Sequence, residues 1–375
     1  MLQACQPISS FVENDRRVLQ KLFYINRFTY SFSDKTFFAA LFTVEKVTNM
    51  SDVLINNSIT VQQTRLEKAF ELRKLSDVKY EGVKPLAKPS LNSRGVYGGN
   101  LCGQALLVAM ETCEAGFTPH SLHSYFIKAG DDTMPCQFEV EKLNDGKNFA
   151  NRLIRVSQKG QMKYIVMISL TKKNSRANTA KEYAKDPKKQ SPFEFQAPVA
   201  SNFYKYKHED LPVTYNDHTK TLQHKIPPDF VDHKLNPDES KKSAAERDLS
   251  FWIRIDDASK DPKYKYAGFG IVSDSLYLTS LSRILHLPIL GDGIGSSGGK
   301  GDHFFSVSLD HSIYFHDDSF DPSKWVFFNF STPRFSNNRV LLQGGYYDEN
   351  GKLFASIVQE GLVFFHSGSE HKAKL

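Results

Sequence analysis

Apolar residues recur along this chain with two different spacings, and the two spacings follow each other in the same order twice. From Gly95 to Cys113 a glycine-rich entry leads into a mostly apolar stretch, which is typical of a buried helix. Four segments with strand-like composition follow, and turn sequences at Asn144–Gly146 and Lys159–Gly160 separate the last three. These strands are expected at Ser121–Asp131, Pro135–Leu143, Asn148–Gln158 and Met162–Leu170.

The second half of the chain repeats this order. Leu249–Ile255 predicts a strand, Ala267–Leu285 a helix and Phe304–His316 another strand. Further strands are expected at Trp325–Ser331, Arg339–Asp348 and Leu353–Phe365. The sequence SLHSYF in the first half is similar to SLDHSIYF in the second, which indicates the same strand in both halves. We therefore predict an α+β chain that arose by tandem duplication, each copy a helix followed by an antiparallel sheet.

The second predicted helix is apolar on most of its surface. The 3-4-3-4 spacing of a buried seam runs through Ile271, Asp274, Leu278, Leu281 and Leu285. Apolar residues also occupy other faces, namely Val272, Leu276 and Tyr277. Such a helix must be wrapped by its own sheet. A further helix is expected from the apolar spacing between Gln63 and Leu75.

These patterns divide the chain into segments. Residues 1–55 form an N-terminal extension, 56–171 the first module, 249–368 the second module and 369–375 a C-terminal tail. Residues 172–248 are dense in Lys, Asp, Asn and Pro, and we expect a long, charged, solvated linker there.

The N-terminal extension has two interpretations. Met1–Asn49 is rich in aromatic residues without clean periodicity, and Met50 begins a stretch that could itself start a protein. The first stretch is therefore either an upstream extension or a targeting presequence. Its acidic residues Glu13, Asp15 and Asp34 argue against a transit peptide, because such peptides are poor in acids.

The composition narrows the class of protein. The chain has 375 residues, of which 40% are hydrophobic and 24% charged, as in a soluble globular protein of two or three domains. No apolar run approaches the roughly 20 residues of a membrane span. The net charge of +6 comes mostly from scattered lysines, and no aromatic-plus-basic motif indicates a nucleic-acid partner. The cysteines lack metal-ligand spacing and indicate reduced thiols in an intracellular protein, so we expect no metal and no cofactor.

Two polar residues lie where the pattern is otherwise apolar. Asp274 lies on the seam of the second helix, where desolvation would raise the pKa of its carboxyl unless donors surround it. The alternative is an N-cap role for Asp274 at a helix start. Gln359 lies on one face of the last strand, where a buried amide either braces the backbone or faces a ligand. Its companions on that face are apolar: Leu353, Ala355, Ile357, Val363 and Phe365.

Neither polar residue has a counterpart in the first copy. When the two copies are aligned on their glycines, Asp274 falls opposite Gly103 and Gln359 opposite Ile168. A purely structural role would be needed in both copies, so the asymmetry favours a site completed mainly by the second copy. Ser308 shares its strand face with other polar residues, and alternation alone indicates that it faces solvent.

Context excludes several familiar motifs. GIGSSG at Gly293–Gly298 has the spacing of a dinucleotide-binding loop, but it leads into a strand instead of leaving one. His120 and His123 would point to opposite faces of a strand, without a Cys/His cluster to complete a metal site. No G-x-S-x-G elbow is present, which argues against an α/β-hydrolase.

The chain ends in a small, a basic and a leucine residue, Ala373–Leu375, after the basic His371 and Lys372. This tripeptide is similar to the Ser-Lys-Leu address of peroxisomal proteins. We therefore expect a peroxisomal matrix protein that binds the peroxisomal import receptor through its C-terminal Ala-Lys-Leu.

Five motifs together carry a family resemblance: YGGNLCGQAL, SLHSYFIKAGD, DGKNFANRLIRV, VSLDHSIYFH and SIVQEG, in this order. With them the chain resembles the type II acyl-CoA thioesterases, in particular their peroxisomal, fungal-like members, from about Leu66 to Phe365 apart from the charged linker. The resemblance implies a tandem double hotdog fold, in which each half is a long central helix wrapped by an antiparallel β-sheet. It also implies hydrolysis of fatty acyl-CoA to fatty acid and CoA, in a homo-oligomer.

The resemblance also implies site residues. The family's catalytic Asp matches Asp274 in VSDSLYL, its Gln matches Gln359 in IVQEG, and its hydroxyl residue, Thr or Ser, matches Ser308 in VSLDHS. These three would activate and position a water molecule, while backbone N–H groups at a helix N-terminus polarise the thioester carbonyl. The N-terminal extension and the glycine-rich insertion before Phe304 depart from the family pattern.

Two other functions are weighed against this one. Hotdog enoyl-CoA hydratases have a His five residues after the Asp, where this chain has Thr279. A non-catalytic acyl-CoA-binding protein would keep a pocket but would need none of the three polar residues.

Overall fold

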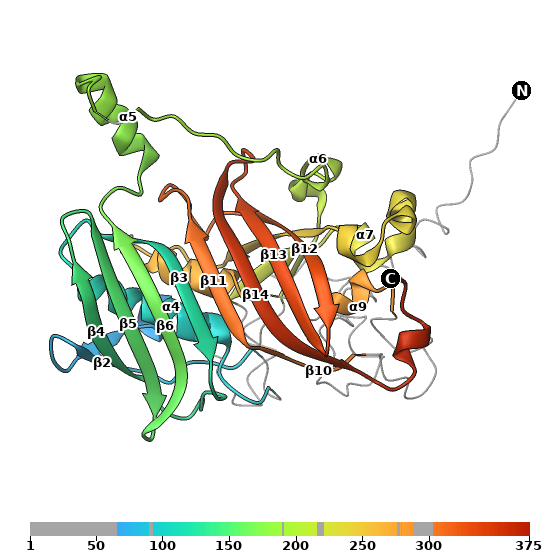
Figure 1. Cartoon of the computed structure of the whole chain (residues 1–375), viewed down its shortest axis with the longest axis horizontal. Helices are drawn as coiled ribbons and strands as arrows, with labels where there is room; N and C mark the ends of the chain where they lie inside the picture. The colour runs from blue at the N-terminus through green and yellow to red at the C-terminus, as the bar shows by residue number, and fades with distance from the viewer. Residues whose placement is uncertain are drawn as a thin grey trace, which may run out of the picture.

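A single antiparallel sheet runs through the part of the chain that the computed structural model describes, which is residues 66–89, 93–189, 191–215, 221–275, 278, 280–287 and 303–375. Among these residues the sheet has 14 strands in the order β1-β2-β4-β5-β6-β3-β11-β14-β13-β12-β9-β8-β7, with β10 also paired to β14 (Figure 1). The strands are β1 (Leu72–Lys74), β2 (Lys79–Gly82), β3 (Thr118–Phe126), β4 (Gln137–Asp145), β5 (Phe149–Gln158), β6 (Gln161–Thr171), β7 (Val213–Tyr215), β8 (Leu222–Lys225), β9 (Leu249–Ile255), β10 (His303–Ser308), β11 (Asp310–Phe315), β12 (Val326–Ser336), β13 (Arg339–Tyr347) and β14 (Leu353–Phe365).

One buried helix lies against each half of the sheet. The helices of the described part are α3 (Leu66–Ala69), α4 (Gly98–Glu111), α5 (Arg176–Lys185), α6 (Asn202–Lys205), α7 (Pro228–Val231), α8 (Tyr264–Val272) and α9 (Leu281–Ile284). Short 3-10 turns are η1 (His208–Asp210), η2 (His233–Leu235), η3 (Pro237–Lys241), η4 (Ala244–Glu246) and η5 (Ser369–His371). Every residue of α4 from Gly99 to Met110 is buried, as is α8 from Tyr266 to Val272. The prediction of apolar helices wrapped by sheet is therefore confirmed.

The two halves join through both the sheet and the helices. The strands that echo each other in sequence, β3 and β11, pair directly, so that Ser124 faces His311 across the junction (Figure 1). Behind the sheet α4 packs on α8 at glycines: a Cβ on Gly99 would lie 2.7 Å from the Gly270 carbonyl oxygen, and one on Gly103 2.6 Å from that of Ala267. This spacing is closer than side chains permit, so the helix backbones touch.

Two predicted helices are shorter in the structure. The helix predicted between Gln63 and Leu75 is reduced to α3, and the chain then enters β1. The helix predicted over Ala267–Leu285 ends at Val272, and α9 forms only later. Ser, Asp and Ser follow Val272, and such side chains compete with helical backbone hydrogen bonds. The Ser273 hydroxyl, for example, donates to the Gly270 carbonyl over 3.0 Å.

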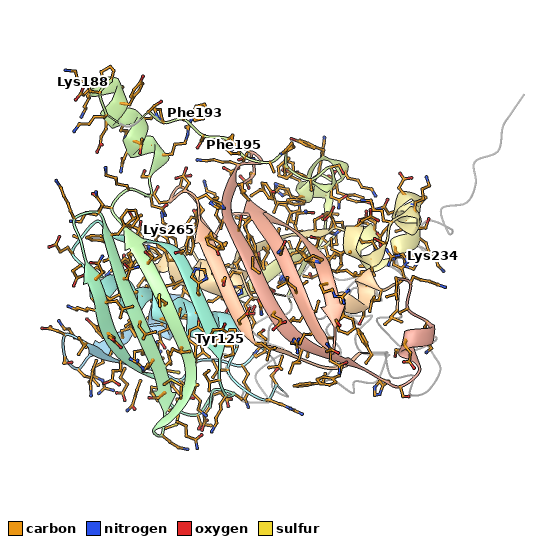
Figure 2. All side chains as sticks on the ribbon, in the orientation of Figure 1. Tyr125, Lys188, Phe193, Phe195, Lys234 and Lys265 are labelled. Atoms are coloured by element: carbon orange, nitrogen blue, oxygen red, sulfur yellow. The ribbon has the colours of Figure 1, made fainter. Side chains whose placement is uncertain are left out.

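The solvated linker predicted over 172–248 is wrong for its second part. The strands β7 and β8 extend the sheet beyond β9, and all four residues of β8, Leu222–Lys225, are buried. The first part contains a helix. Helix α5 has no buried residue and stands away from the sheet, and Phe193 and Phe195 after it are 87% and 92% exposed (Figures 1 and 2).

Other sequence expectations fall outside the described residues. These are the N-terminal extension of residues 1–55, the motif at Gly293–Gly298, the insertion before Phe304, and the positions of Leu276, Tyr277 and Thr279. Within the described part, no helix is both long enough and apolar enough to cross a membrane.

Candidate active site

The carboxylate of Asp274 lies at the end of one central helix and at the start of the other. Asp274 lies two residues beyond Val272, the last residue of α8, and its main-chain N–H donates to the Ile271 carbonyl over 3.4 Å. Its Oδ2 accepts a hydrogen bond from the Gly99 N–H, 2.9 Å away, in the first turn of α4. The alternative of a local N-cap role is therefore wrong, because no helix that the structure describes begins at Asp274. It interacts instead with the positive end of the α4 dipole.

Glycine at the start of α4 makes this approach possible. A Cβ on Gly98 would lie 2.7 Å from Asp274 Oδ2 and 2.8 Å from the ring of Phe126. A side chain there would displace either the carboxylate or the ring.

Gln359 joins the carboxylate to a hydroxyl. Its side chain points to the buried face of β14 and is fully buried, as alternation predicted. The amide Nε2 donates to Asp274 Oδ1 over 3.1 Å and to Ser308 Oγ over 2.5 Å. The structure therefore brings together all three residues that the family resemblance implied: Asp274 just after α8, Ser308 on β10 and Gln359 on β14.

The solvent-facing orientation expected for Ser308 is wrong. Ser308 pairs with Gly361 of β14, whereas Ser312, four residues later, pairs with Val358. The register therefore shifts by one residue at Leu309, whose N–H donates to the Glu360 carbonyl and separates β10 from β11. An irregularity of this kind reverses the alternation of side chains before it, which turns the Ser308 hydroxyl toward Gln359.

Burial governs the ionisation of this cluster. Burial raises the pKa of Asp274 from 3.8 to about 6, while the hydrogen bonds from Gln359 and Gly99 lower it and offset part of the shift. A carboxyl with a pKa of about 6 is mostly ionised at neutral pH and is still basic enough to accept a proton. Such a value suits a general base.

A second layer of polar contacts fixes the end of α8. The Tyr97 hydroxyl donates to the Ile271 carbonyl over 3.1 Å, and the Tyr346 hydroxyl donates to the Val272 carbonyl over 3.1 Å. Ser273 Oγ lies 3.0 Å from Nε2 of the buried His311, whose pKa burial lowers to about 4. At neutral pH this imidazole is therefore uncharged and adds no cation beside Asp274.

Sequence reasoning missed the contribution of the first half. The three side chains come from the second copy, as the asymmetry indicated, but the Gly99 N–H comes from the first. The signal was present as the glycine pair at the start of the first predicted helix, because glycines there allow another chain segment to approach a helix N-terminus. Among the described residues, no group of three or more His, Cys, Asp or Glu side chains could hold a metal ion.

Family comparisons match both halves of the chain. The N-terminal domain of the acyl-CoA thioesterases matches residues 87–171 and their C-terminal domain matches residues 207–363, together more than half of the chain. The chain belongs to the type II acyl-CoA thioesterase family. It is a thioester hydrolase.

Individual relatives agree with the family assignment. The thioesterase is 26% identical to the peroxisomal acyl-coenzyme A thioester hydrolase 1 of Saccharomyces cerevisiae, over 83% of this chain and 97% of the relative. It is 26% identical to acyl-CoA thioesterase 2 of Haemophilus influenzae, over 84% of this chain and 99% of that protein.

A solved structure confirms the fold. The acyl-CoA thioesterase II TesB2 of Mycobacterium marinum superposes with a TM-score of 0.59 at 22% identity, covering 81% of this thioesterase and 99% of that chain. The tandem double hotdog expected from the sequence is therefore confirmed.

Proposed function

We propose that this thioesterase hydrolyses fatty acyl-CoA to free fatty acid and CoA, with Asp274, Ser308 and Gln359 as the catalytic residues. One observation carries the proposal: Gln359 hydrogen-bonds both Asp274 and Ser308, and the same carboxylate accepts the first-turn Gly99 N–H of α4. A carboxylate, a hydroxyl and a helix N-terminus thus meet in one partly buried place. These are the groups that activation of water beside a carbonyl needs.

In this mechanism Asp274 acts as the general base. A water molecule attacks the thioester carbonyl carbon and gives one proton to the carboxylate. The tetrahedral intermediate then collapses, the C–S bond breaks, and the CoA sulfur leaves with the electron pair and is protonated. Because Ser308 Oγ accepts from the Gln359 amide, its own O–H proton is free to hold the attacking water in line.

The start of α4 supplies a donor for the developing oxyanion. The Gly99 N–H is engaged by Asp274, but the N–H of Gly98 makes no hydrogen bond with any residue that the structure describes. The first N–H groups of a helix lack intrahelical partners and carry its positive partial charge. We assign the Gly98 N–H to the thioester oxygen.

We further propose that the enzyme works in the peroxisomal matrix. The C-terminal Ala-Lys-Leu and the naming of the yeast relative as peroxisomal support this location. Deletion of Leu375 should leave a fluorescent fusion in the cytosol, while the full chain should give punctate staining. Punctate staining of the deletion variant would reject this address.

Homo-oligomerisation is proposed from the outer face of the sheet. Tyr125 on β3, Met167 on β6 and Tyr314 on β11 are 60%, 46% and 41% exposed, and Figure 2 shows Tyr125 on this open face. These strands are neighbours, so the apolar side chains form one surface that a second copy can cover. Light scattering on the purified chain tests this: a monomer at micromolar concentration would contradict it.

The activity test is release of thiol from palmitoyl-CoA. Wild-type enzyme should release one CoA thiol per fatty acid, and the Asp274→Asn variant should lose orders of magnitude in kcat while it remains folded. Asp132→Asn, an exposed carboxylate paired with Lys88, is the matched control and should keep full activity. Normal turnover of Asp274→Asn would reject the assigned base.

The same assay separates the alternatives. A hydratase would consume the double bond of an α,β-unsaturated acyl-CoA without releasing thiol. A binding protein would retain acyl-CoA without turnover.

A further inference from the structure

The last residues of the chain fold back onto the body. After β14 the chain forms η5 and ends beside α9. The Lys374 N–H donates to the Leu285 carbonyl over 2.9 Å, and Ala373 packs against the buried core. The Leu375 side chain remains 85% exposed. The tripeptide Ala373–Leu375 is therefore held by its main chain while its terminal side chain faces solvent.

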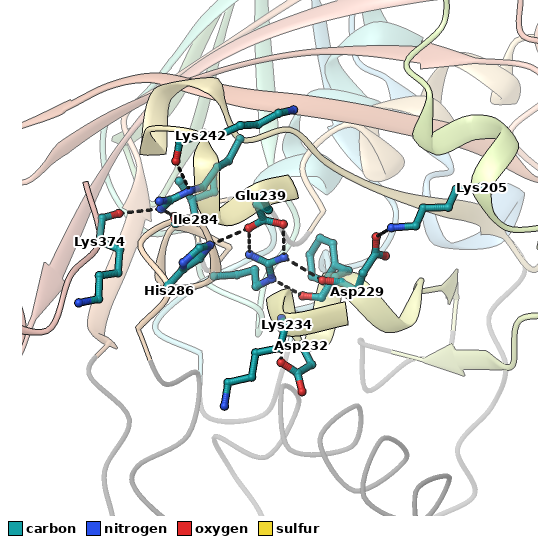
Figure 3. A network of polar contacts seen from close by, with 12 residues as sticks. Lys205, Asp229, Asp232, Lys234, Glu239, Lys242, Ile284, His286 and Lys374 are labelled. Carbon is teal, nitrogen blue, oxygen red and sulfur yellow. Dashed lines mark hydrogen bonds and ion pairs between the residues drawn. The ribbon is translucent and has the colours of Figure 1, made fainter. Parts of the chain in front are cut away.

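A buried arginine binds the carbonyl of Lys374, the residue whose N–H bonds Leu285. Arg247 is 3% exposed, and its Nη1 donates to the Lys374 carbonyl over 2.6 Å and to the Ile284 carbonyl over 2.5 Å. Its Nε donates to the Lys242 carbonyl over 3.2 Å. Figure 3 shows Lys374, Ile284 and Lys242 meeting around this guanidinium. All three acceptors are main-chain oxygens, and the one on Lys374 belongs to the tail, so the arginine links the main chain of the tail to that of α9 and of Lys242.

The tail lies on the end of α9, beside a buried ion pair. The last carbonyls of a helix lack intrahelical partners, and the arginine and the tail supply donors to those of α9. Beside them Glu239 forms a bidentate ion pair with Arg283 and accepts from His286 Nε2 over 2.8 Å (Figure 3). Bidentate, buried pairs of this kind are geometrically rigid. The tail therefore docks on a fixed surface.

We propose that the docked tail withholds the C-terminal Ala-Lys-Leu address from its import receptor, so that receptor binding requires release from Arg247. This rests on the peroxisomal address proposed above. A receptor that reads a C-terminal tripeptide has to enclose its main chain and terminal carboxylate. In the docked state the Lys374 N–H and carbonyl are already engaged, and Ala373 lies against the core. Receptor and protein body compete for the same groups.

The size of the effect follows from the contacts. The apparent affinity of the receptor falls by the fraction of chains whose tail is released. Two hydrogen bonds and a small apolar contact favour docking by an amount that corresponds to about tenfold in that fraction. The intact protein should therefore bind the receptor about tenfold more weakly than its own free tail peptide does.

Fluorescence anisotropy with the tripeptide-binding domain of the import receptor tests the proposal. A synthetic peptide of residues 366–375 sets the affinity of the released tail, and full-length wild-type protein is measured against it. Arg247→Gln should raise the affinity of the full chain to within about twofold of the peptide. Arg254→Gln is the matched control, because Arg254 also hydrogen-bonds a buried partner, Gln223, but lies outside the tail contacts.

A second variant keeps the buried arginine. A flexible Gly-Ser spacer inserted after Gly368 leaves the tripeptide and Arg247 unchanged but lowers the local concentration of the tail at its docking surface. This variant should also bind the receptor more tightly than wild type. It keeps the test valid if Arg247→Gln fails to fold.

Carboxypeptidase digestion measures how accessible the docked tail is, without any receptor. Leu375 and Lys374 should be released more slowly from wild type than from Arg247→Gln or the spacer variant. Equal digestion rates, or a full chain that binds the receptor as tightly as the peptide, would overturn the docking proposal and leave the address standing. A peptide that does not bind the receptor would instead reject the address itself, and with it any competition for the tail.

Discussion

The carboxylate of Asp274 accepts its main-chain hydrogen bond from Gly99, a residue of the other half of the chain, over 2.9 Å. Neither half could form this contact alone, because the segment just after α8 supplies the carboxylate and α4 supplies the helix N-terminus. The tandem duplication thus does more than double the core. It places the end of one central helix against the beginning of the other.

The pseudo-two-fold counterpart of this contact shows why the first copy does not form a second carboxylate site. With Gly99 aligned to Gly270, the counterpart of Asp274 is Gly103, and the structure places Gly103 against Gly270: a Cβ on Gly270 would lie 2.7 Å from the Gly103 N. The two-fold relation is kept, but the position equivalent to Asp274, Gly103, has no side chain. There the helix backbones pack directly, and no carboxylate remains.

Gly99→Ala should damage both stability and catalysis. The added Cβ would lie 2.7 Å from the Gly270 oxygen and 2.8 Å from the Ile271 Cα, so α4 and α8 must separate. Overpacking of this kind costs about 1–3 kcal/mol. The same shift moves the Gly99 N–H away from Asp274 and should lower kcat. Thermal unfolding and thiol release measure the two effects.

The control for that substitution is Gly268→Ala on α8. Its Cβ would meet side chains alone, Pro322 at 3.2 Å, Leu66 at 3.4 Å and Ile255 at 3.5 Å, with no backbone atom among them. Alanine also favours a helix over glycine by up to about 1 kcal/mol. Stability should stay within about 1 kcal/mol of wild type with full activity. Equal behaviour of the two variants would contradict the role given to the α4–α8 contact.

Ser308 should need its hydroxyl but not its exact side chain. Ser308→Ala removes the acceptor of the Gln359 amide and the donor to water, and should lower kcat by about tenfold to a hundredfold with little change in KM. Ser308→Thr keeps the hydroxyl and should retain most activity. Ser312→Ala on the outer face is the control. A Ser308→Ala enzyme with wild-type kcat would remove Ser308 from the mechanism.

The rate should fall in acid because Asp274 must be ionised to accept a proton. With a pKa of about 6, log(kcat/KM) should be flat at neutral pH and should decline by one unit per pH unit below about 6. Gln359→Leu removes a hydrogen bond that favours the ionised form, so its residual activity should show a midpoint at higher pH. A midpoint that Gln359→Leu leaves in place would indicate that another group controls the rate.

Periodicity predicted the strands of the sheet and the inward orientation of Gln359 well, because both depend on local alternation. The strands after α4 and α8 lie close to their expected positions, and Gln359 faces inward as its apolar neighbours required. The same rule failed for Ser308 because one irregular residue, Leu309, reverses the alternation. Alternation gives no information on where a strand loses its register.

The remaining errors of the sequence predictions arise from tertiary contacts. Apolar spacing extended the second helix beyond Val272, but Ser273 bonds the Gly270 carbonyl and the chain leaves the helix, which brings Asp274 to α4. Likewise β8 looks polar in sequence, yet it is buried because it pairs with β7 and β9, and its His224 packs on Phe251 and hydrogen-bonds Ser275. Such partners are distant in sequence, and spacing cannot reveal them.

Asp274→Asn should change the pH dependence of stability as well as the activity. The folded-state pKa of Asp274, about 6, exceeds its ordinary value of 3.8, so between these values the folded enzyme binds more protons than the unfolded chain. The stability contributed by this group is therefore present in acid and lost as the pH rises through about 6, an effect on the order of 3 kcal/mol. The variant lacks this loss, so its melting temperature relative to wild type should rise between pH 4 and pH 7. Asp132→Asn, which removes an exposed carboxylate, controls for net charge. If the difference in melting temperature between Asp274→Asn and wild type stays constant across this range, folding does not raise the pKa of Asp274. The physical basis for its role as the base would then be lost.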